Sequence, residues 1–168
     1  MMKTYKIFYD TEFIEDGKTI VPLSLGFVTE DGMQLYLVIT DVDHSKANDF
    51  VKENVLPYLH TREATYCTRK EAATIIKIWV RDVSRNRRVE FWANYCAYDW
   101  ILLCQLFGTM AELPVGWPQF SFEIQHELRR RGYCRSSDLP ELKTVYIPHN
   151  CLDDARGVKE RYELLSSI

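Results

Sequence analysis

The fold is decided by the stretch Tyr5-Lys-Ile-Phe-Tyr-Asp-Thr-Glu-Phe13, an apolar strand pattern interrupted by two acids, Asp10 and Glu12. Side chains alternate between the two faces of a strand, so Phe8, Asp10 and Glu12 are expected on one face. Two carboxylates side by side at a position directed to the core repel each other and lose hydration. A divalent cation held by oxygen ligands is the usual compensation. The stretch therefore predicts a metal site on the first strand.

Length and composition predict one ordinary globular domain, residues 1–168. The chain has 168 residues, 46% of them hydrophobic and 27% charged, without a low-complexity tract. A net charge of −3 and a pI near 5.8 argue against a protein that grips long duplex nucleic acid by charge alone. Local basic clusters stand at Arg85, Arg87 and Arg88 and at 129–131, and such runs are more often solvated helix ends than binding patches.

The five cysteines, at positions 67, 96, 104, 134 and 151, form no C-x-x-C pair and are odd in number. A reduced, cytoplasmic setting follows most simply. The N-terminus lacks the apolar segment of an export signal, and the longest apolar-rich run, 100–107, is too short to span a bilayer. We therefore expect a soluble, unexported protein with no membrane partner.

Hydrophobic periodicity and turn residues predict three strands followed by helices that alternate with a further strand. The strands are expected at 5–13, 19–29, 34–40 and 89–93, and the helices at 45–59, 68–83, 97–107, 120–131 and 150–165. Thr68-Arg-Lys-Glu71 forms a capping box at the start of the second helix. This order predicts a three-layer α/β domain with a mixed central sheet flanked by helices.

The last helix separates two adjacent acids. Its buried stripe consists of residues at spacings of four and three, namely Cys151, Ala155, Val158, Tyr162 and Leu165. At about 100° per residue, Asp154 lies roughly 60° from the centre of this stripe, and Asp153 roughly 160° away. We therefore expect Asp154 to border the core and Asp153 to face water.

Two further motifs supply candidate residues. Asp99 ends the motif Asn-x₃-Tyr-Asp, which begins at Asn94, but an acid in a first helical turn is alone most often a favourable dipole placement. His149 and Asp154 form His-x₄-Asp, a weak string that recurs at 44–49, where we interpret the acid as a solvated first-turn residue. Each string is weak by itself, and only the order of all three along the chain is specific.

In this order the chain resembles the DEDDh subgroup of 3′→5′ exonucleases, which have an RNase H-like fold. The three motifs are Asp10-Thr-Glu12, Asn94-Tyr-Cys-Ala-Tyr-Asp99 and His149-Asn-Cys-Leu-Asp-Asp154. The sequence around these motifs, at Phe8 to Gly17 and at Gly116-Trp-Pro118, is similar to that of the short stand-alone exoribonucleases of mycobacteria and phages. These enzymes are sometimes labelled polyadenylate-specific. The resemblance covers nearly the whole chain and implies an RNase H-like three-layer α/β domain.

The resemblance also implies a two-metal phosphodiesterase. Asp10, Glu12 and Asp154 would hold one Mg²⁺ or Mn²⁺, and Asp10 would share a second ion with Asp99, directly or through water. His149 would remove a proton from the attacking water, because an imidazole group exchanges protons near neutral pH. The product would be a nucleoside 5′-monophosphate released from a free 3′ end.

The partner implied is the 3′ end of a single-stranded RNA, with a homodimer left open. Glu12, Phe13 and Asn94 are expected to contact the terminal nucleotide. Trp117, in a loop rich in proline and glycine, is free to stack on a base or to cap the fold. Two alternatives stay open: a 3′→5′ DNA exonuclease of the proofreading or repair type, and a nucleic-acid-binding module without catalysis.

Overall fold

The strand that carries Asp10 and Glu12 lies inside a six-stranded sheet with the order β4-β3-β2-β1-β5-β6. The pairs β1–β2 and β2–β3 are antiparallel, whereas β1–β5, β3–β4 and β5–β6 are parallel, so the sheet is mixed as predicted. The strands are β1 (Tyr5–Glu15), β2 (Ile20–Thr29), β3 (Gln34–Ile39), β4 (Thr65–Cys67), β5 (Val89–Ala93) and β6 (Phe122–Glu123). The computed structural model describes residues 4–134, 138, 142 and 146–167.

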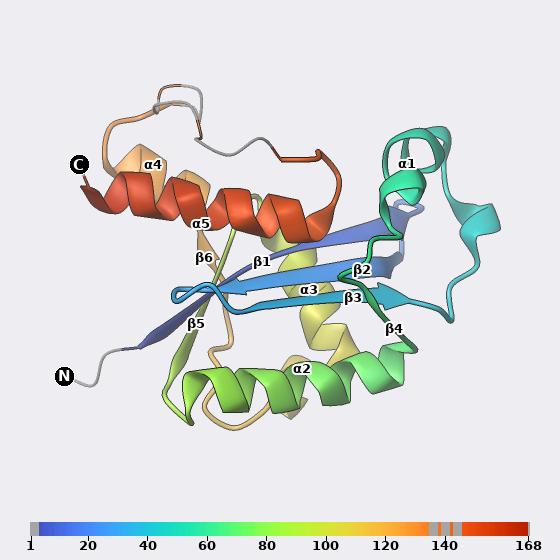
Figure 1. Ribbon diagram of the computed structural model, residues 1–168, viewed down its shortest axis with the longest axis horizontal. Coiled ribbons are helices and arrows are strands. Elements are labelled where there is room, and N and C mark those ends of the chain that lie inside the picture. The colour runs from blue at the N-terminus through green and yellow to red at the C-terminus, as the bar shows by residue number, and fades with distance from the viewer. Residues whose placement is uncertain (1–3, 135–137, 139–141, 143–145, 168) are drawn as a thin grey trace.

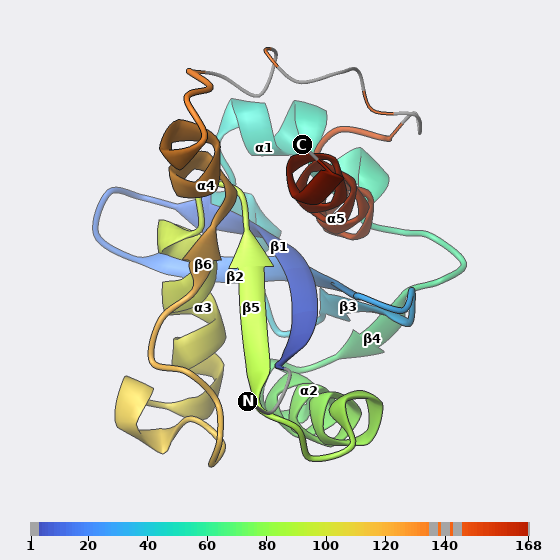
Figure 2. The ribbon, with the colours of Figure 1, turned by 90° about the vertical axis from the view of Figure 1, so that its left-hand side faces the viewer.

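Helices cover both faces of this sheet, which makes three layers (Figure 1). One face is covered by α4 (Ile124–Arg130) and α5 (Cys151–Ser167), and the other by α2 (Arg69–Ser84) and α3 (Ala97–Phe107). Figure 2 shows α4 and α5 beyond one end of β5, and α2 beside the other end. None of the helices in the described ranges is long and apolar enough to cross a membrane.

The predicted alternation of β1 decides which layer each side chain enters. Ile7 and Tyr9 are buried in the core that contains Ile76 of α2 and Leu103 of α3. Phe8 is buried in a second core, together with Val158 of α5. The face that Phe8 shares with the two acids is therefore the face that α5 covers, as expected for a period of two residues.

The prediction of one continuous helix at 45–59 is wrong, because three short helical pieces occupy this region. They are a 3₁₀ turn at His44–Lys46, α1 (Asp49–Asn54) and a 3₁₀ turn at Leu56–Tyr58. The Asn48 side chain accepts a hydrogen bond from the Val51 amide, which starts α1 only at Asp49. Pro57 has no N–H and its ring clashes with the preceding turn of an α-helix, so α1 does not continue to residue 59.

Two strands were not expected, and both lie at edges of the sheet. β4 has three residues and β6 has two, which is too short for any alternation of polar and apolar residues to stand out. Because β6 occupies Phe122–Glu123, the helix expected at 120–131 begins only at Ile124. The expected loop that leads to Pro148 lies partly outside the described residues.

Candidate active site

Three of the candidate acids meet between β1 and α5. Asp10 and Glu12 project from β1, and Asp154 projects from the first turn of α5. Each offers a carboxylate oxygen, and these three oxygens lie within 4.8 Å of one another. In the described part of the chain, no cationic side chain forms an ion pair with any of the three. The arrangement is therefore a concentration of negative charge with no ion-paired cation in that part of the chain, although the more distant Arg161 charge acts on Asp154.

The close approach of α5 to the sheet depends on Gly26, which pairs with Asp10 across β1 and β2. A Cβ atom at Gly26 would lie 2.4 Å from the main-chain carbon and oxygen of Cys151, the first residue of α5. The Cys151 thiol also lies 3.1 Å from the Ser24 hydroxyl. Only glycine lets the helix backbone come this near, so Gly26 sets the distance at which Asp154 reaches β1. A glycine inside a strand pattern is the sequence signal for such a close approach of two backbones.

The electrostatics of the three acids follow from burial and mutual repulsion. Burial raises the pKa of Asp10 well above its usual range, and the charges of Asp99, Asp154 and Glu12 raise it further. Burial, followed by the charges of Asp154 and Asp99, raises the pKa of Glu12 to about 8. Burial also raises the pKa of Asp154, against hydrogen bonding and charge from His149. A divalent cation at this position would favour the ionised form of all three groups.

Asp99, at the start of α3, is buried beside β1 but outside the three-acid cluster. Its Oδ1 accepts hydrogen bonds from the Thr11 amide at 3.1 Å and the Thr11 hydroxyl at 2.5 Å. Burial raises the pKa of Asp99 to about 6, although these two hydrogen bonds oppose the shift. Among the neighbouring charges, that of Asp99 raises the pKa of Asp10 most. Asp99 therefore acts on the cluster electrostatically, while Thr11 holds its carboxylate.

The turn before α3, the helix that carries Asp99, is held by a residue that sequence reasoning missed, Glu123 of β6. Its carboxylate accepts hydrogen bonds from the amides of Tyr95 at 3.0 Å and Cys96 at 2.7 Å. Asn94 is half-buried, and its Oδ1 accepts a hydrogen bond from Gln125 at 2.7 Å. No local sequence pattern predicts this role of Glu123, because its hydrogen-bond partners lie 27 and 28 residues earlier in the chain.

His149 stands directly before α5 and is tied to the acid cluster through its backbone. Its amide donates to Asp154 Oδ2 at 3.0 Å, and its φ of 61° is uncommon for a residue other than glycine. The imidazole meets the Phe50 ring of α1 edge-on, with centroids 5.1 Å apart and planes at 86°. The next residue, Asn150, is buried and donates to the Tyr58 carbonyl at 2.9 Å. The local fold thus positions His149 beside Asp154.

The expectation that Asp153 faces water is wrong. Its side chain is only 15% exposed and forms an ion pair with Arg156 at 2.5 Å. Its other oxygen accepts a hydrogen bond from the Ile147 amide at 3.0 Å. Helix periodicity indicates only which side of α5 is buried against the sheet, whereas the opposite side is covered by Ile147 of the preceding loop. Asp153 holds that loop, while Asp154 faces the other acids as expected.

Phe13 follows the acids at a bulge in β1. The register of β1 against β2 shifts between Glu12 and Phe13, so that Phe13 lies opposite Pro22. A bulge redirects the side chains that follow it. Phe13 packs edge-on against Tyr98 of α3 at 5.6 Å, and about half of the Tyr98 surface is exposed. Phe13 and Tyr98 therefore form an accessible aromatic pair one residue away from the acid cluster.

A family model described as the 3'-5' exoribonuclease Rv2179c-like domain matches residues 5–164. The chain belongs to this family. It is 36% identical over 163 residues to "3'-5' exoribonuclease Rv2179c" of Mycobacterium tuberculosis H37Rv, covering 96% of this chain and 94% of the relative. The same values hold for "3'-5' exoribonuclease MT2234.1" of strain CDC 1551 of that organism. The predicted resemblance to short exoribonucleases is confirmed.

Solved structures with the same fold are more distant in sequence. A 3'-exonuclease with a histone mRNA stem-loop aligns at a TM-score of 0.52 and 12% identity, over 97% of this chain and 64% of that one. The Pan2 catalytic unit of Neurospora crassa aligns at a TM-score of 0.52 and 15% identity, over 97% of this chain and 27% of that one. The predicted RNase H-like three-layer α/β fold is confirmed.

Proposed function

We propose that the chain is a metal-dependent 3′→5′ exoribonuclease that releases nucleoside 5′-monophosphates from the 3′ ends of single-stranded RNA. The observation that carries this proposal is the cluster of Asp10, Glu12 and Asp154 in a chain of an exoribonuclease family. Three buried carboxylates without an ion-paired protein cation are stable in their charged forms only with a bound positive charge. An enzyme that cleaves phosphodiesters through metal ions uses that kind of oxygen-rich site.

The residues present fit Mg²⁺ or Mn²⁺, two ions per site. Hard divalent cations prefer carboxylate oxygens, and the cluster offers three within 4.8 Å. Asp10, Glu12 and Asp154 would hold one ion, and Asp10 with Asp99 would hold the other. When bound, such ions lower the pKa of a water molecule and stabilise negative charge on phosphate oxygens. The high pKa of Glu12 makes ion binding depend on pH, since the carboxyl must lose its proton to become a ligand.

The residues around the cluster would supply proton transfer and the positioning of catalytic side chains. His149 would accept the proton of the attacking water, and the amide contact to Asp154 fixes its backbone next to the cluster. Thr11 keeps the Asp99 carboxylate in one orientation through two hydrogen bonds. The ring of Phe50 limits the orientations open to the imidazole. Positioning of this kind lowers the entropy lost on the way to the transition state.

Phe13, Glu12 and Asn94 are our candidates for contacts to the terminal nucleotide. The exposed aromatic pair of Phe13 and Tyr98 offers a ring on which a base can stack. Glu12 or the backbone after it would accept a hydrogen bond from the terminal 2′-hydroxyl, the group that distinguishes RNA from DNA. We also propose a cytoplasmic setting, in keeping with five free cysteines. Light scattering of the purified chain decides between a monomer and the homodimer that the sequence leaves open.

A matched pair of oligonucleotides that differ only at the last sugar tests the substrate. We expect faster loss of the ribonucleotide end. Equal rates, or faster loss of the deoxyribonucleotide end, would contradict the RNA substrate and favour the alternative of a 3′→5′ DNA exonuclease. A nucleic-acid-binding module without catalysis would release no mononucleotide from either substrate, and added Mg²⁺ would leave its melting temperature unchanged.

A further inference from the structure

A pocket far from the acid cluster gathers positive charge. It lies between the second half of α2, the start of β5 and the loop before β6, and it has a volume of about 530 Å³. We call it the basic pocket, and its polar wall consists of Lys77, Arg81, Arg87 and Arg88 next to Trp117. No carboxylate stands among the described residues that line it. In a chain with a net charge of −3, this is a local reversal of sign.

The four cations of the basic pocket differ in how they are held. The Arg87 guanidinium lies over the Tyr5 ring at 4.4 Å and donates to the Ser84 carbonyl at 2.9 Å, which fixes it. Arg81 forms an ion pair with its neighbour Asp82 at 2.8 Å. Lys77 and Arg88 form no ion pair with the described residues. Two positive charges are therefore available for an anionic ligand.

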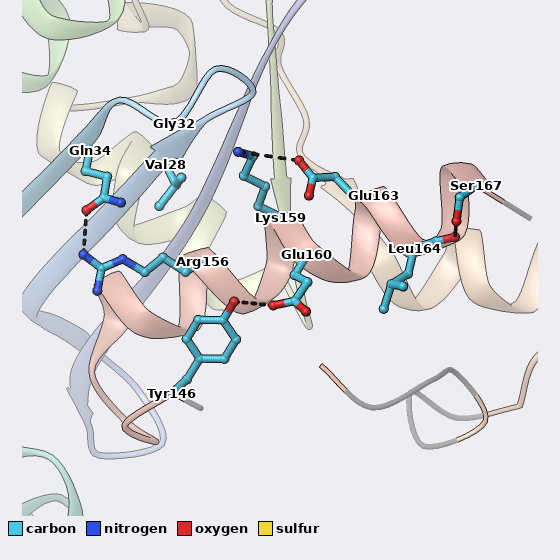
Figure 3. Close-up of a pocket in the computed structure, with 10 residues that line it drawn as sticks. All are labelled: Val28, Gly32, Gln34, Tyr146, Arg156, Lys159, Glu160, Glu163, Leu164 and Ser167. Carbon is cyan, nitrogen blue, oxygen red and sulfur yellow. Dashed lines mark hydrogen bonds and ion pairs between the residues drawn. The ribbon is translucent and has the colours of Figure 1, made fainter. Parts of the chain in front are cut away.

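A second pocket also contains cations, but other groups of the protein bind them. It has a volume of about 500 Å³ and lies between α5 and the β2–β3 hairpin. Figure 3 shows Arg156 bonded to Gln34, and Lys159 paired with Glu163. Because its cations are bonded to groups of the protein itself, it carries no free charge of one sign. The basic pocket differs in just this respect.

Aromatic side chains continue from the basic pocket along the edge of the sheet. Trp117 packs on Phe91 at 4.8 Å, as a cap of the fold, and also lines a neighbouring pocket of about 400 Å³. That pocket is shared with Arg88 and includes Phe120, which is 57% exposed and lies 5.1 Å from the Phe122 ring. Phe122 belongs to β6, the edge strand beside β5 (Figure 2). Exposed rings next to free cations are typical of single-strand binding surfaces.

The distance from this surface to the acids suits one RNA strand. Val89, at the basic pocket, lies opposite Tyr5 in the parallel pairing of β5 with β1. Asp10 lies five residues further along β1, which corresponds to about 17 Å at the rise of a strand. A stacked single strand advances about 3.4 Å per nucleotide. The pocket borders the α2 face of the sheet and Asp10 lies on the α5 face, so the strand must also pass around the β6 edge, past Phe120. The basic pocket therefore lies at least about five nucleotides away from a 3′ end held at Asp10.

We propose that the basic pocket and the ring of Phe120 bind the 5′ portion of the single-stranded RNA whose 3′ end occupies the acid cluster. This inference rests on the proposed exoribonuclease function. Lys77 and Arg88 contact backbone phosphates, and Phe120 stacks on a base. The acid cluster repels the polyanion, and the basic pocket compensates for that repulsion at a distance. Long substrates thus bind more tightly than dinucleotides.

The test compares the wild type with the double variant Lys77→Gln/Arg88→Gln on a dinucleotide and on a long oligoribonucleotide. We expect KM for the long RNA to rise roughly tenfold, with unchanged kcat and unchanged hydrolysis of the dinucleotide. The slope of log Kd against log salt for long RNA, measured with chelator present, should become shallower by about 1.4 in the double variant. Each of the two lost phosphate contacts accounts for about 0.7 of this change. Phe120→Ala should raise KM for long RNA without altering the slope.

Two controls make the result specific. The variant Arg62→Gln/Lys70→Gln removes the same charge from exposed positions outside the pocket and should keep the wild-type slope and KM. The variant Lys77→Arg/Arg88→Lys keeps both charges and should do the same. The inference is overturned if the double variant degrades long RNA with the KM and slope of the wild type. Failure of the proposed function is a separate result, because the wild type would then release no mononucleotide from any RNA.

Discussion

Replacing Glu12 by glutamine should stabilise the protein when metal is absent. Folding raises the pKa of Glu12 from 4.5 to about 8, first through burial. A carboxyl whose pKa rises on folding contributes stability that is fully present below its unfolded value and is lost as pH rises through its folded value. The window is therefore pH 4.5 to 8. At about 1.4 kcal/mol per pH unit, ionisation of Glu12 costs at most about 5 kcal/mol at pH 8.

Glutamine does not ionise, so Glu12→Gln should raise the free energy of unfolding by about 2 to 5 kcal/mol at pH 8 and by under about 1 kcal/mol at pH 5. The assay is urea denaturation with a chelator at both pH values. With Mg²⁺ at a hundredfold excess over Kd, the wild type should gain about 2.7 kcal/mol, and the variant should gain little. Glu53→Gln, at an exposed helix position, is the matched control and should change neither value. An unchanged or lower stability of Glu12→Gln at pH 8 would refute the account of a repulsive acid cluster.

Four further substitutions separate the roles in the site. His149→Ala should lower turnover by roughly 10²–10⁴ and keep most of the Mg²⁺-induced stabilisation, measured by kinetics and thermal melting; loss of both would make it a ligand or structural residue. Asp154→Asn should abolish turnover and most of the Mg²⁺ response, whereas Asp153→Asn should keep the Mg²⁺ response and lose about 1 kcal/mol of stability through weaker bonding to the loop. Equal loss of the response in both variants would contradict the assignment. Gly26→Ala should displace α5 from β2 and abolish the response to Mg²⁺, because its Cβ would collide with Cys151; a wild-type response would show that α5 tolerates the side chain.

The sequence predicted those features that depend on local periodicity. The alternation along β1 placed Asp10 and Glu12 on the face that α5 covers, and the phase of α5 placed Asp154 towards them. The mixed sheet followed from the hairpins and the alternation of later elements. These predictions succeed because burial on one face imposes a period of two or 3.6 residues that a single sequence displays.

Features that depend on contacts between distant segments were not predictable in the same way. Asp153 is removed from water by a loop that folds back over α5. Glu123 holds the turn before α3 from a strand of only two residues. The free charge of Lys77 and Arg88 depends on which acids lie nearby in space, so the sequence could not tell a solvated helix end from a binding pocket.

The central claim is that the acid cluster drives metal-dependent removal of nucleotides from a 3′ end. The most direct measurement is a time course on single-stranded RNA labelled at its 5′ end, with Mg²⁺, with Mn²⁺ or with EDTA, resolved by length. We predict products that shorten one nucleotide at a time in the presence of either ion, release of nucleoside 5′-monophosphates, and full-length RNA with EDTA or with Asp154→Asn. Degradation that persists in EDTA, or cleavage that begins inside the strand, would contradict the account.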